Sequence, residues 1–342
     1  MSEAPPIKER VNISKPEVVK NLSSEIDLSK ALILDAHLIK TFRACEQKFY
    51  WFEEMHIIGK GKSAAPGFGI SMHSAIEHFR KSKMAGHGYR ISLEVGGQAL
   101  IESYKKAMPP ENMQEVMVDD KRSLPNAMRI YQGYCSHYEP YLYKFHYVEI
   151  PFALYIGQVN TWEGDVDVVY VGIIDAVLEH RERIYVNDLK TTGWVLNESW
   201  LEGFRMDQGL IGYTIAAKEL LGVDTQYALI HGIWVQKEPK SDKAKKLDEY
   251  FKTKEIYWDD EQLREWHHNT LRTAKRIVES RHNNDWQMDY GQNCGAFGGC
   301  SYRPLCAAPL GFRHRLIELD YENAFWAPLE DERLQKIAPM EF

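Results

Sequence analysis

The sequence predicts an α/β fold in which a mixed β-sheet is flanked by helices. Two observations carry this prediction. Segments with helical periodicity and segments typical of strands follow one another along the 342 residues, and two apolar runs, VDVVYVGIID and RIYVNDLK, are typical of a β-hairpin. A hydrophobic content of 44% is enough to form the core of one large domain with insertions, or of two smaller domains.

The order of the expected elements follows from periodicity and from turn residues. Residues 1–30 are polar and lack a sustained period, so we expect an arm, with the folded part beginning near Leu32. Pro109-Pro110 ends the second of three helical patterns. The full series is helices at 71–83, 91–108 and 124–141, strands from 144 to 192, a helix at 207–221, strands at 226–236 and 255–258, a helix at 260–281 and a loop-rich end.

The predicted hairpin brings three polar side chains together. A turn about Arg181-Glu182 sets Asp175 opposite Asp188, and Lys190 then shares their face because side chains alternate along a strand. Two neighbouring carboxylates repel unless a cation lies between them, and Mg²⁺ and Mn²⁺ prefer such oxygen ligands. The pattern therefore predicts phosphodiester hydrolysis by a metal-dependent nuclease. The plain alternative is a surface ion pair across a hairpin.

Charge and hydropathy exclude some classes of protein. The net charge of −7 argues against a protein that coats nucleic acid, since that role needs clustered Lys and Arg. No apolar stretch is long enough for a membrane span and no secretory signal is visible, so the expected location is cytoplasmic, or the host cytoplasm if the chain is viral. The lysines of QKEPKSDKAKK form either a solvated loop or a loop facing DNA.

Four of the five cysteines are predicted to bind a metal centre, whereas Cys135 resembles a core residue. Both gaps in the terminal group, NCGAFGGCSYRPLC, hold five residues, which is wider than the usual zinc knuckle and leaves room for an iron-sulfur cluster. Spacing alone leaves both metals open, and buried or incidental thiols are the alternative. The proposed ligands are Cys45, Cys294, Cys300 and Cys306.

Several motifs in a fixed order resemble one family. TFRACEQKFYW, GISMHSAIEHF, VEIPF, GIID, DLKTT and the three-cysteine group are similar to the iron-sulfur branch of the RecB-like nucleases in the PD-(D/E)xK superfamily, to which AddB and the CRISPR-adaptation nucleases belong. The resemblance spans about Leu32 to Cys306. It implies a restriction-endonuclease-like core at 31–310, with a helical insertion at about 71–141, a catalytic sheet at about 144–258, a cysteine group at 294–306 and an extension at 311–342.

The resemblance also implies roles for individual residues. His73, Asp175, Asp188 and the main-chain carbonyl of Leu189 would hold Mg²⁺ or Mn²⁺, and Lys190 would be the catalytic lysine. Glu149 is a supporting candidate. Family members carry a glutamine and a tyrosine one helical turn apart, and Gln208 is the better match here because Tyr213 follows five residues later rather than four. The cysteines would bind a 4Fe-4S cluster, with Zn²⁺ as the less favoured occupant.

These observations predict a metal-dependent DNA nuclease, expected to act as an exonuclease on DNA ends or single strands in DNA repair, recombination, viral replication or CRISPR processing. The alternative is a non-catalytic DNA-binding or scaffold subunit beside a helicase, recombinase or integrase. A zinc-stapled enzyme acting on another phosphodiester is a third reading. The sequence has no phosphate-binding G-x-x-x-x-G-K-S/T loop, so any ATP-driven unwinding would come from a partner.

Overall fold

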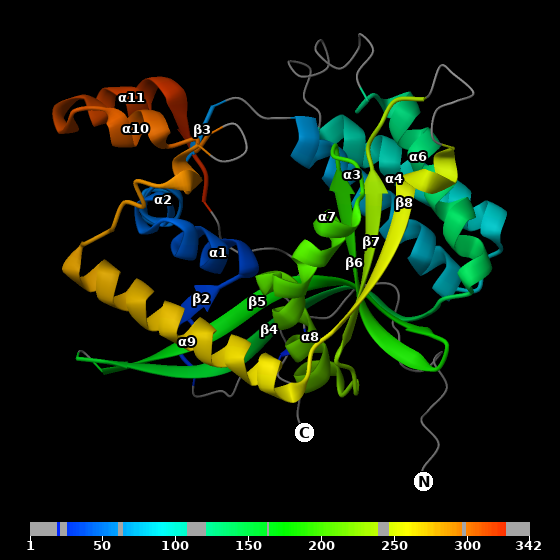
Figure 1. The fold of residues 1–342 in the computed structure, drawn as a ribbon, viewed down its shortest axis with the longest axis horizontal. Helices are drawn as coiled ribbons and strands as arrows, with labels where there is room; N and C mark the ends of the chain where they lie inside the picture. The colour runs from blue at the N-terminus through cyan, green and yellow to red at the C-terminus, as the bar shows by residue number, and fades with distance from the viewer. Residues whose placement is uncertain are drawn as a thin grey trace. The chain divides into compact units, whose positions relative to one another are not determined.

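The computed structural model describes residues 19–20, 26–60, 64–107, 121–162, 164–238, 246–295 and 299–325 (Figure 1). The chain folds as two compact units. Residues 62–150 and 173–259 belong to the first unit, and residues 17–61, 151–172 and 260–342 belong to the second. Strands β4 (Lys144–Thr161) and β5 (Gly164–His180) each have residues in both units.

The sheet of the first unit is mixed, as the sequence predicts. The end of β5 pairs antiparallel with β6 (Arg183–Thr192), β6 pairs parallel with β7 (Tyr227–Trp234), and β7 pairs antiparallel with β8 (Phe251–Tyr257). Almost every residue of β7 is buried, which is typical of a strand covered on both faces. The expected β5–β6 turn is confirmed, because Arg181 and Glu182 have φ values of 51° and 62°, the left-handed pair that two-residue hairpin turns require.

Three helices pack on this sheet: α3 (Ala64–Met84), α4 (Tyr89–Ala107) and α6 (Leu124–Tyr138). Their shared core includes Leu189 of β6 and Phe251 of β8. The third helix is shorter than predicted, since 139–141 form the 3-10 turn η3 (Glu139–Tyr141). Pro109-Pro110 lies outside the described residues.

The rest of the first unit contains α7 (Glu198–Glu202), η4 (Gly203–Met206), α8 (Gln208–Leu221) and η5 (Leu247–Tyr250). Helix α8 begins where the sequence predicts, because the Asp207 side chain accepts hydrogen bonds from the backbone N–H groups of Gly209 and Leu210. Gly222, with a φ of 61°, ends it. Of the basic segment, residues 239–245 lie outside the described part of the chain.

The second unit contains further strand pairings and its own helices. β1 (Val19–Lys20) runs parallel to β4, and β2 (Leu32–Leu34) runs parallel to β5. The strand β1 falls within the segment predicted as a polar arm, and two residues are too few to show any periodicity. The remaining elements before the long helix are α1 (Ala36–Ala44), α2 (Glu46–Phe49), the π-helical turn η2 (Tyr50–Glu54) and β3 (Ile57–Gly59).

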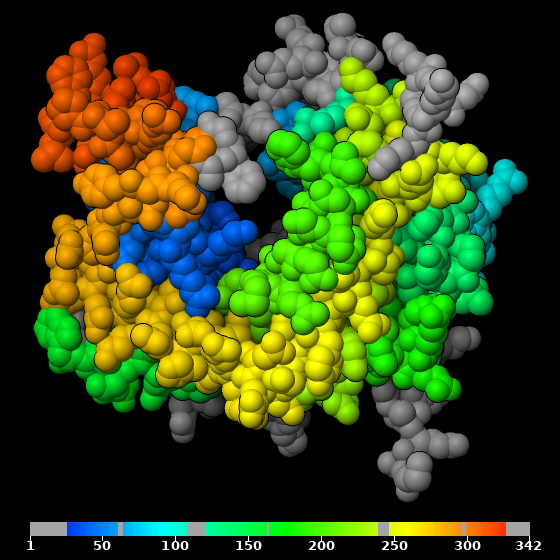
Figure 2. All heavy atoms as spheres, viewed as in Figure 1, coloured from blue at the N-terminus to red at the C-terminus, as the bar shows by residue number. Residues whose placement is uncertain are grey.

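Helix α9 (Asp260–Asn283) confirms the last long helical pattern, because its buried residues recur at helical spacing. Figure 2 shows this helix, in yellow and orange, on the surface of the molecule. The predicted loop-rich end is wrong in part. It contains η6 (Gln292–Cys294), α10 (Arg303–Ala307), η8 (Leu310–Phe312), α11 (Arg313–Asp320) and β9 (Tyr321–Asn323), which pairs antiparallel with β3.

Those short C-terminal elements depend on tertiary packing. Trp51, Ile57, Tyr302, Leu305 and Tyr321 form a small buried cluster that joins them to η2 and β3. Helices of five and eight residues have little stability alone, and they are too short to show a clear helical period in the sequence. In the described part of the chain, no helix combines the length and apolar character needed to cross a membrane.

Candidate active site and cysteine cavity

The β5–β6 hairpin positions the acid-acid-lysine set in the first unit. Ala176 lies opposite Asn187, so the next positions toward the open end of the hairpin are Asp175 and Asp188. Lys190 follows on the same side of β6, and its Nζ lies 2.5 Å from Oδ2 of Asp188. Asp188 is only 3% exposed, whereas the Lys190 side chain is 36% exposed. The lysine therefore joins a buried carboxylate to the solvent side of the site.

Asp175 is held on both sides. Its Oδ2 accepts a hydrogen bond from the backbone N–H of Leu189 at 2.8 Å, and its Oδ1 lies 3.5 Å from Nδ1 of His73 on α3. Burial favours a neutral carboxyl, but the charge and hydrogen bond of His73 outweigh it and lower the pKa of Asp175 to about 2. Asp175 is thus an anion whose two oxygens point toward a helix and toward the facing strand.

Glu149 completes a three-residue group that is suited to a metal. One ligand atom from each of His73, Glu149 and Asp175 lies within 4.8 Å of the others. Glu149 has a φ of 54° inside strand β4, a conformation that non-glycine residues rarely adopt and that is often found at functional sites. Glu149 was only a supporting candidate from the sequence, because nothing in VEIPF reveals a left-handed residue within a strand.

The electrostatics of this group favour a bound cation. Burial and repulsion by Asp175 raise the pKa of Glu149 to about 8, and burial raises the pKa of Asp188 to about 6 despite the charge of Lys190. Burial disfavours a charged imidazole, yet Asp175 raises the pKa of His73 to about 9. The protonated histidine thus supplies positive charge between carboxylates. A divalent ion with oxygen and nitrogen ligands fits this donor set once His73 releases its proton.

The other predicted site residues are placed less directly. Gln208 is the first residue of α8, and Tyr213 lies on the same helix. Burial lowers the pKa of Lys190, but the carboxylates of Asp188 and Asp175 outweigh this effect and raise the pKa. Asp207, the N-cap of α8, adds to the increase. The sequence reasoning missed Asp207, and its only signal was the cap position before a helical pattern.

Helix α3 also contacts the second strand of the hairpin. Nη2 of Arg80 donates to Oδ1 of Asn187 at 2.6 Å, and the Asn187 amide donates to the carbonyl of Leu229 at 2.7 Å. Arg80 follows His73 by two helical turns, so one face of α3 reaches both strands. The sequence reasoning missed this pair, because Arg80 and Asn187 give no local signal of contact.

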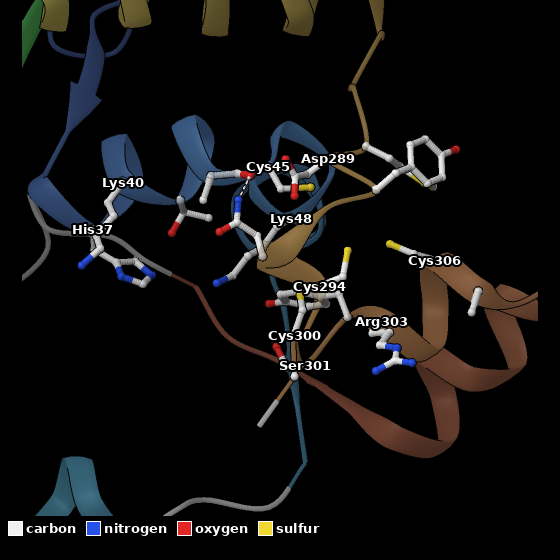
Figure 3. A pocket seen from close by; sticks show the side chains of 18 residues that line it. His37, Lys40, Cys45, Lys48, Asp289, Cys294, Cys300, Ser301, Arg303 and Cys306 are labelled. Atoms are coloured by element: carbon white, nitrogen blue, oxygen red, sulfur yellow. Dashed lines mark hydrogen bonds between the residues drawn. The ribbon is translucent and has the colours of Figure 1, made fainter. Parts of the chain in front are cut away.

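The four cysteines of the second unit line one cavity of about 720 Å³, which we call the cysteine cavity (Figure 3). Cys45 lies between α1 and α2, Cys294 ends η6, and Cys306 is on α10. The backbone N–H of Cys300 donates a hydrogen bond to the carbonyl of Cys294 at 3.0 Å. Figure 3 shows the four side chains bordering the same open space. Among the described residues they form no compact group within 4.8 Å.

The surroundings of the cysteines differ in the two units. Burial raises the pKa of the Cys306 thiol, and the nearby Trp51 side chain partly opposes this effect. Cys135 is 1% exposed in the helical core of the first unit, as a core residue would be. Gly299 has a φ of 106° beside Cys300, so this loop uses a conformation that glycine permits.

Comparison with known proteins shows which family the chain belongs to. The pattern of the PD-(D/E)XK nuclease superfamily matches residues 36–307. A solved structure described as "Crystal structure of SSO0001" is similar over 70% of this chain and 85% of that chain, with 11% sequence identity and a TM-score of 0.27. No curated protein matches the sequence. Because the superfamily pattern covers well over half of the chain, the protein belongs to the PD-(D/E)XK nuclease superfamily.

Proposed function

We propose that this nuclease is a Mg²⁺- or Mn²⁺-dependent deoxyribonuclease that acts as an exonuclease on DNA ends or single strands. The observation that carries the proposal is the convergence of His73, Glu149 and Asp175 beside the ion pair of Lys190 with the buried Asp188. A surface ion pair does not require this group, because such pairs are exposed and need no third carboxylate. Closely spaced, partly buried acids are instead typical of a divalent metal site.

Each residue has a definite task in this proposal. His73, Glu149 and Asp175 hold the metal, joined by Asp188 and the carbonyl of Leu189. A divalent metal held there would supply Lewis-acid chemistry, which would polarise a phosphoryl oxygen and activate water for attack. Asp175 also accepts the Leu189 N–H, which fixes the strand that carries the lysine.

Lys190 acts on the phosphate and its attacking water. Its ammonium is raised in pKa by the nearby acids and so remains charged, which suits it to neutralise charge that develops on the phosphate. The 36% exposure of its side chain leaves Lys190 accessible to a substrate, while its ion pair with the buried Asp188 holds the ammonium in position. Gln208 on α8 is assigned to substrate or lysine contact.

We also propose that the cysteine cavity holds a 4Fe-4S cluster with a structural role. The four thiols share one cavity but do not converge as tightly as ligands of a single ion. Sulfur ligands about 2.3 Å from one zinc ion lie roughly 4 Å apart, so three of them would fall inside a 4.8 Å group. The wider arrangement favours a cluster of several irons over zinc. Thiols that bind such a cluster must stay reduced, so a cytoplasmic location is part of this proposal.

DNA is the proposed substrate, and a helicase, recombinase or integrase is the proposed type of partner in repair, recombination or CRISPR adaptation. The net charge of −7 predicts that DNA contacts are local and are weakened by salt.

The test is cleavage of end-labelled single- and double-stranded DNA in Mg²⁺ or Mn²⁺ by the wild type and by Lys190→Ala. The matched control is Lys252→Ala, which removes an exposed lysine of β8. We expect cleavage by the wild type and the control and a loss of about 10²–10⁴-fold in Lys190→Ala. A ladder from one end identifies an exonuclease and its polarity. DNA binding without cleavage in either metal would support the scaffold function instead.

A further inference from the structure

A second cavity in the first unit has no role in the proposed reaction. It has a volume of about 330 Å³ and is bordered by α3, α6 and the first residues of β4. None of the residues assigned to the metal or to the catalytic lysine lines it. Its volume lies within the range of small-molecule sites in proteins. We call it the Arg80 cavity, after the buried guanidinium on its wall.

Arg80 is a buried cation whose hydrogen-bond partners are neutral. It is 2% exposed, and its Nη2 donates to the Tyr134 hydroxyl at 2.8 Å and to the Asn187 side-chain oxygen at 2.6 Å. Its guanidinium carbon lies 5.1 Å from the centre of the Phe145 ring. Among the described residues, no carboxylate forms an ion pair with Arg80. A buried charge without a counter-ion is costly, so this wall of the cavity favours an anion.

The other charges on the wall are already balanced. Lys83 pairs with Glu139 at 3.2 Å, and both residues line the cavity. Lys144 also lines it and pairs with Glu179 at 2.8 Å. The excess charge of the Arg80 cavity is therefore the single positive charge of the guanidinium.

The rest of the wall is rich in rings. Tyr134, Tyr138, Tyr143 and Phe145 all line the cavity. Burial raises the pKa of Tyr134 to about 12 and raises the pKa of Tyr143, so these hydroxyls keep their protons and add no negative charge. The cavity thus combines a planar cation with aromatic surfaces. Guanidinium groups bind phosphate through parallel hydrogen bonds, and aromatic side chains stack on nucleobases.

We propose that the Arg80 cavity binds a nucleoside monophosphate, with the phosphate at Arg80 and the base among the rings of Tyr143 and Phe145. The choice of a nucleotide among aromatic anions rests on the proposed exonuclease function, whose products are nucleotides. The site adds a second binding position to the first unit, separate from the residues that hold the metal. Arg80 also connects the cavity to β6, because it donates a hydrogen bond to Asn187, the residue directly before Asp188.

The test measures nucleotide binding without catalysis. The full chain carrying Lys190→Ala is titrated with thymidine 5′-monophosphate by calorimetry in EDTA, so that neither a bound metal nor the catalytic lysine holds the phosphate. Thymidine and inorganic phosphate are titrated in parallel. We expect one saturable site for the nucleotide and affinities at least about tenfold weaker for the two fragments. Thymidine lacks the phosphate that contacts the guanidinium, and inorganic phosphate lacks the base that contacts the rings.

Two further substitutions locate the site. Arg80→Lys keeps the charge and removes the planar fork, while Tyr143→Ser removes a partly exposed ring and is the safer change for folding. Both are expected to weaken nucleotide binding at least about tenfold. Tyr257→Ser is the matched control, because Tyr257 is a 42% exposed tyrosine of β8 that does not line the cavity. Circular dichroism checks that each variant is folded.

Three results would overturn the proposal. They are the absence of saturable nucleotide binding, equal binding of phosphate or thymidine alone, and binding that survives both Arg80→Lys and Tyr143→Ser in folded protein. A failure here is distinct from a failure of the proposed nuclease, which is judged by DNA cleavage in the wild type. A chain that cleaves DNA but does not bind the nucleotide contradicts the Arg80 cavity alone.

Discussion

The imidazole of His73 lies 3.5 Å from the carboxylate of Asp175, so helix α3 meets the β5–β6 hairpin at the first of its two acids. Two turns later on the same helix, Arg80 bonds Asn187 on the other strand. The helix therefore fixes both strands that carry the Asp175, Asp188 and Lys190 set. This double attachment places an imidazole nitrogen beside the carboxylates and holds the hairpin against the helix.

The metal-binding role of His73 predicts a specific loss of affinity. His73→Ala removes the nitrogen donor of the three-residue group, and we expect Mn²⁺ binding to weaken at least about tenfold. The matched control is His78→Ala on the same helix, whose Nδ1 lies 2.8 Å from the Ser74 carbonyl oxygen. Calorimetry in the absence of DNA measures both affinities. Equal Mn²⁺ affinities for the two variants would remove His73 from the proposed ligand set.

The cysteine cavity predicts bound iron. In protein purified without oxygen, the wild type should contain iron and show a broad visible absorbance, and Cys300→Ser should lose most of both because a ligand is removed. Cys135→Ser serves as the control, since Cys135 lies in the core of the first unit. Elemental analysis gives the metal content of each protein. Zinc in place of iron would contradict the cluster and leave the nuclease proposal standing.

A pH dependence of stability is expected from Glu53 on η2. Burial raises the pKa of Glu53 to about 7 from the usual 4.5, and Arg281, 3.9 Å away, offsets only part of this effect. The folded state therefore holds more protons than the unfolded state between pH 4.5 and 7. The free energy of unfolding should fall as pH rises through this window, by less than about 1.4 kcal/mol per pH unit.

Glu53→Gln should remove this contribution, because glutamine does not titrate. Relative to the wild type, the variant should gain stability at pH 8 and show a flatter profile from pH 5 to 7. Urea unfolding at several pH values measures the difference. Glu94→Gln, at an exposed position of α4, should leave the wild-type slope unchanged. A Glu53→Gln profile as steep as that of the wild type would show that another group is responsible.

Packing of α3 on α4 predicts opposite outcomes for two adjacent glycines. A Cβ at Gly96 would lie 2.5 Å from the Ala75 carbonyl oxygen, whereas a Cβ at Gly97 would meet the flexible Met128 side chain at 3.6 Å. Gly96→Ala should lower the free energy of unfolding by about 1–3 kcal/mol. Gly97→Ala should be neutral or stabilising by roughly 0.5–1 kcal/mol, since alanine favours a helix. Equal effects in thermal unfolding would contradict this close approach.

The sequence alone determined the long elements and the hairpin. Periodicity located α3, α4, α6 and α9, because each long helix has a continuous apolar face. The alternation of side chains and the two-residue turn placed Asp175, Asp188 and Lys190 on one side of the hairpin, since local geometry fixes the register. The order of the motifs indicated the superfamily that the comparison then established.

Only the tertiary structure decided which distant groups join these residues. The left-handed backbone at Glu149 brings a third ligand atom near His73 and Asp175, and no local pattern encodes such a conformation. The short helices after Cys294 form because Tyr302 and Leu305 pack against Trp51, which lies about 250 residues earlier in the chain. Arg80 looked like any helical surface residue until folding buried it beside Asn187. Contacts between residues far apart in sequence depend on packing, which periodicity and spacing do not report.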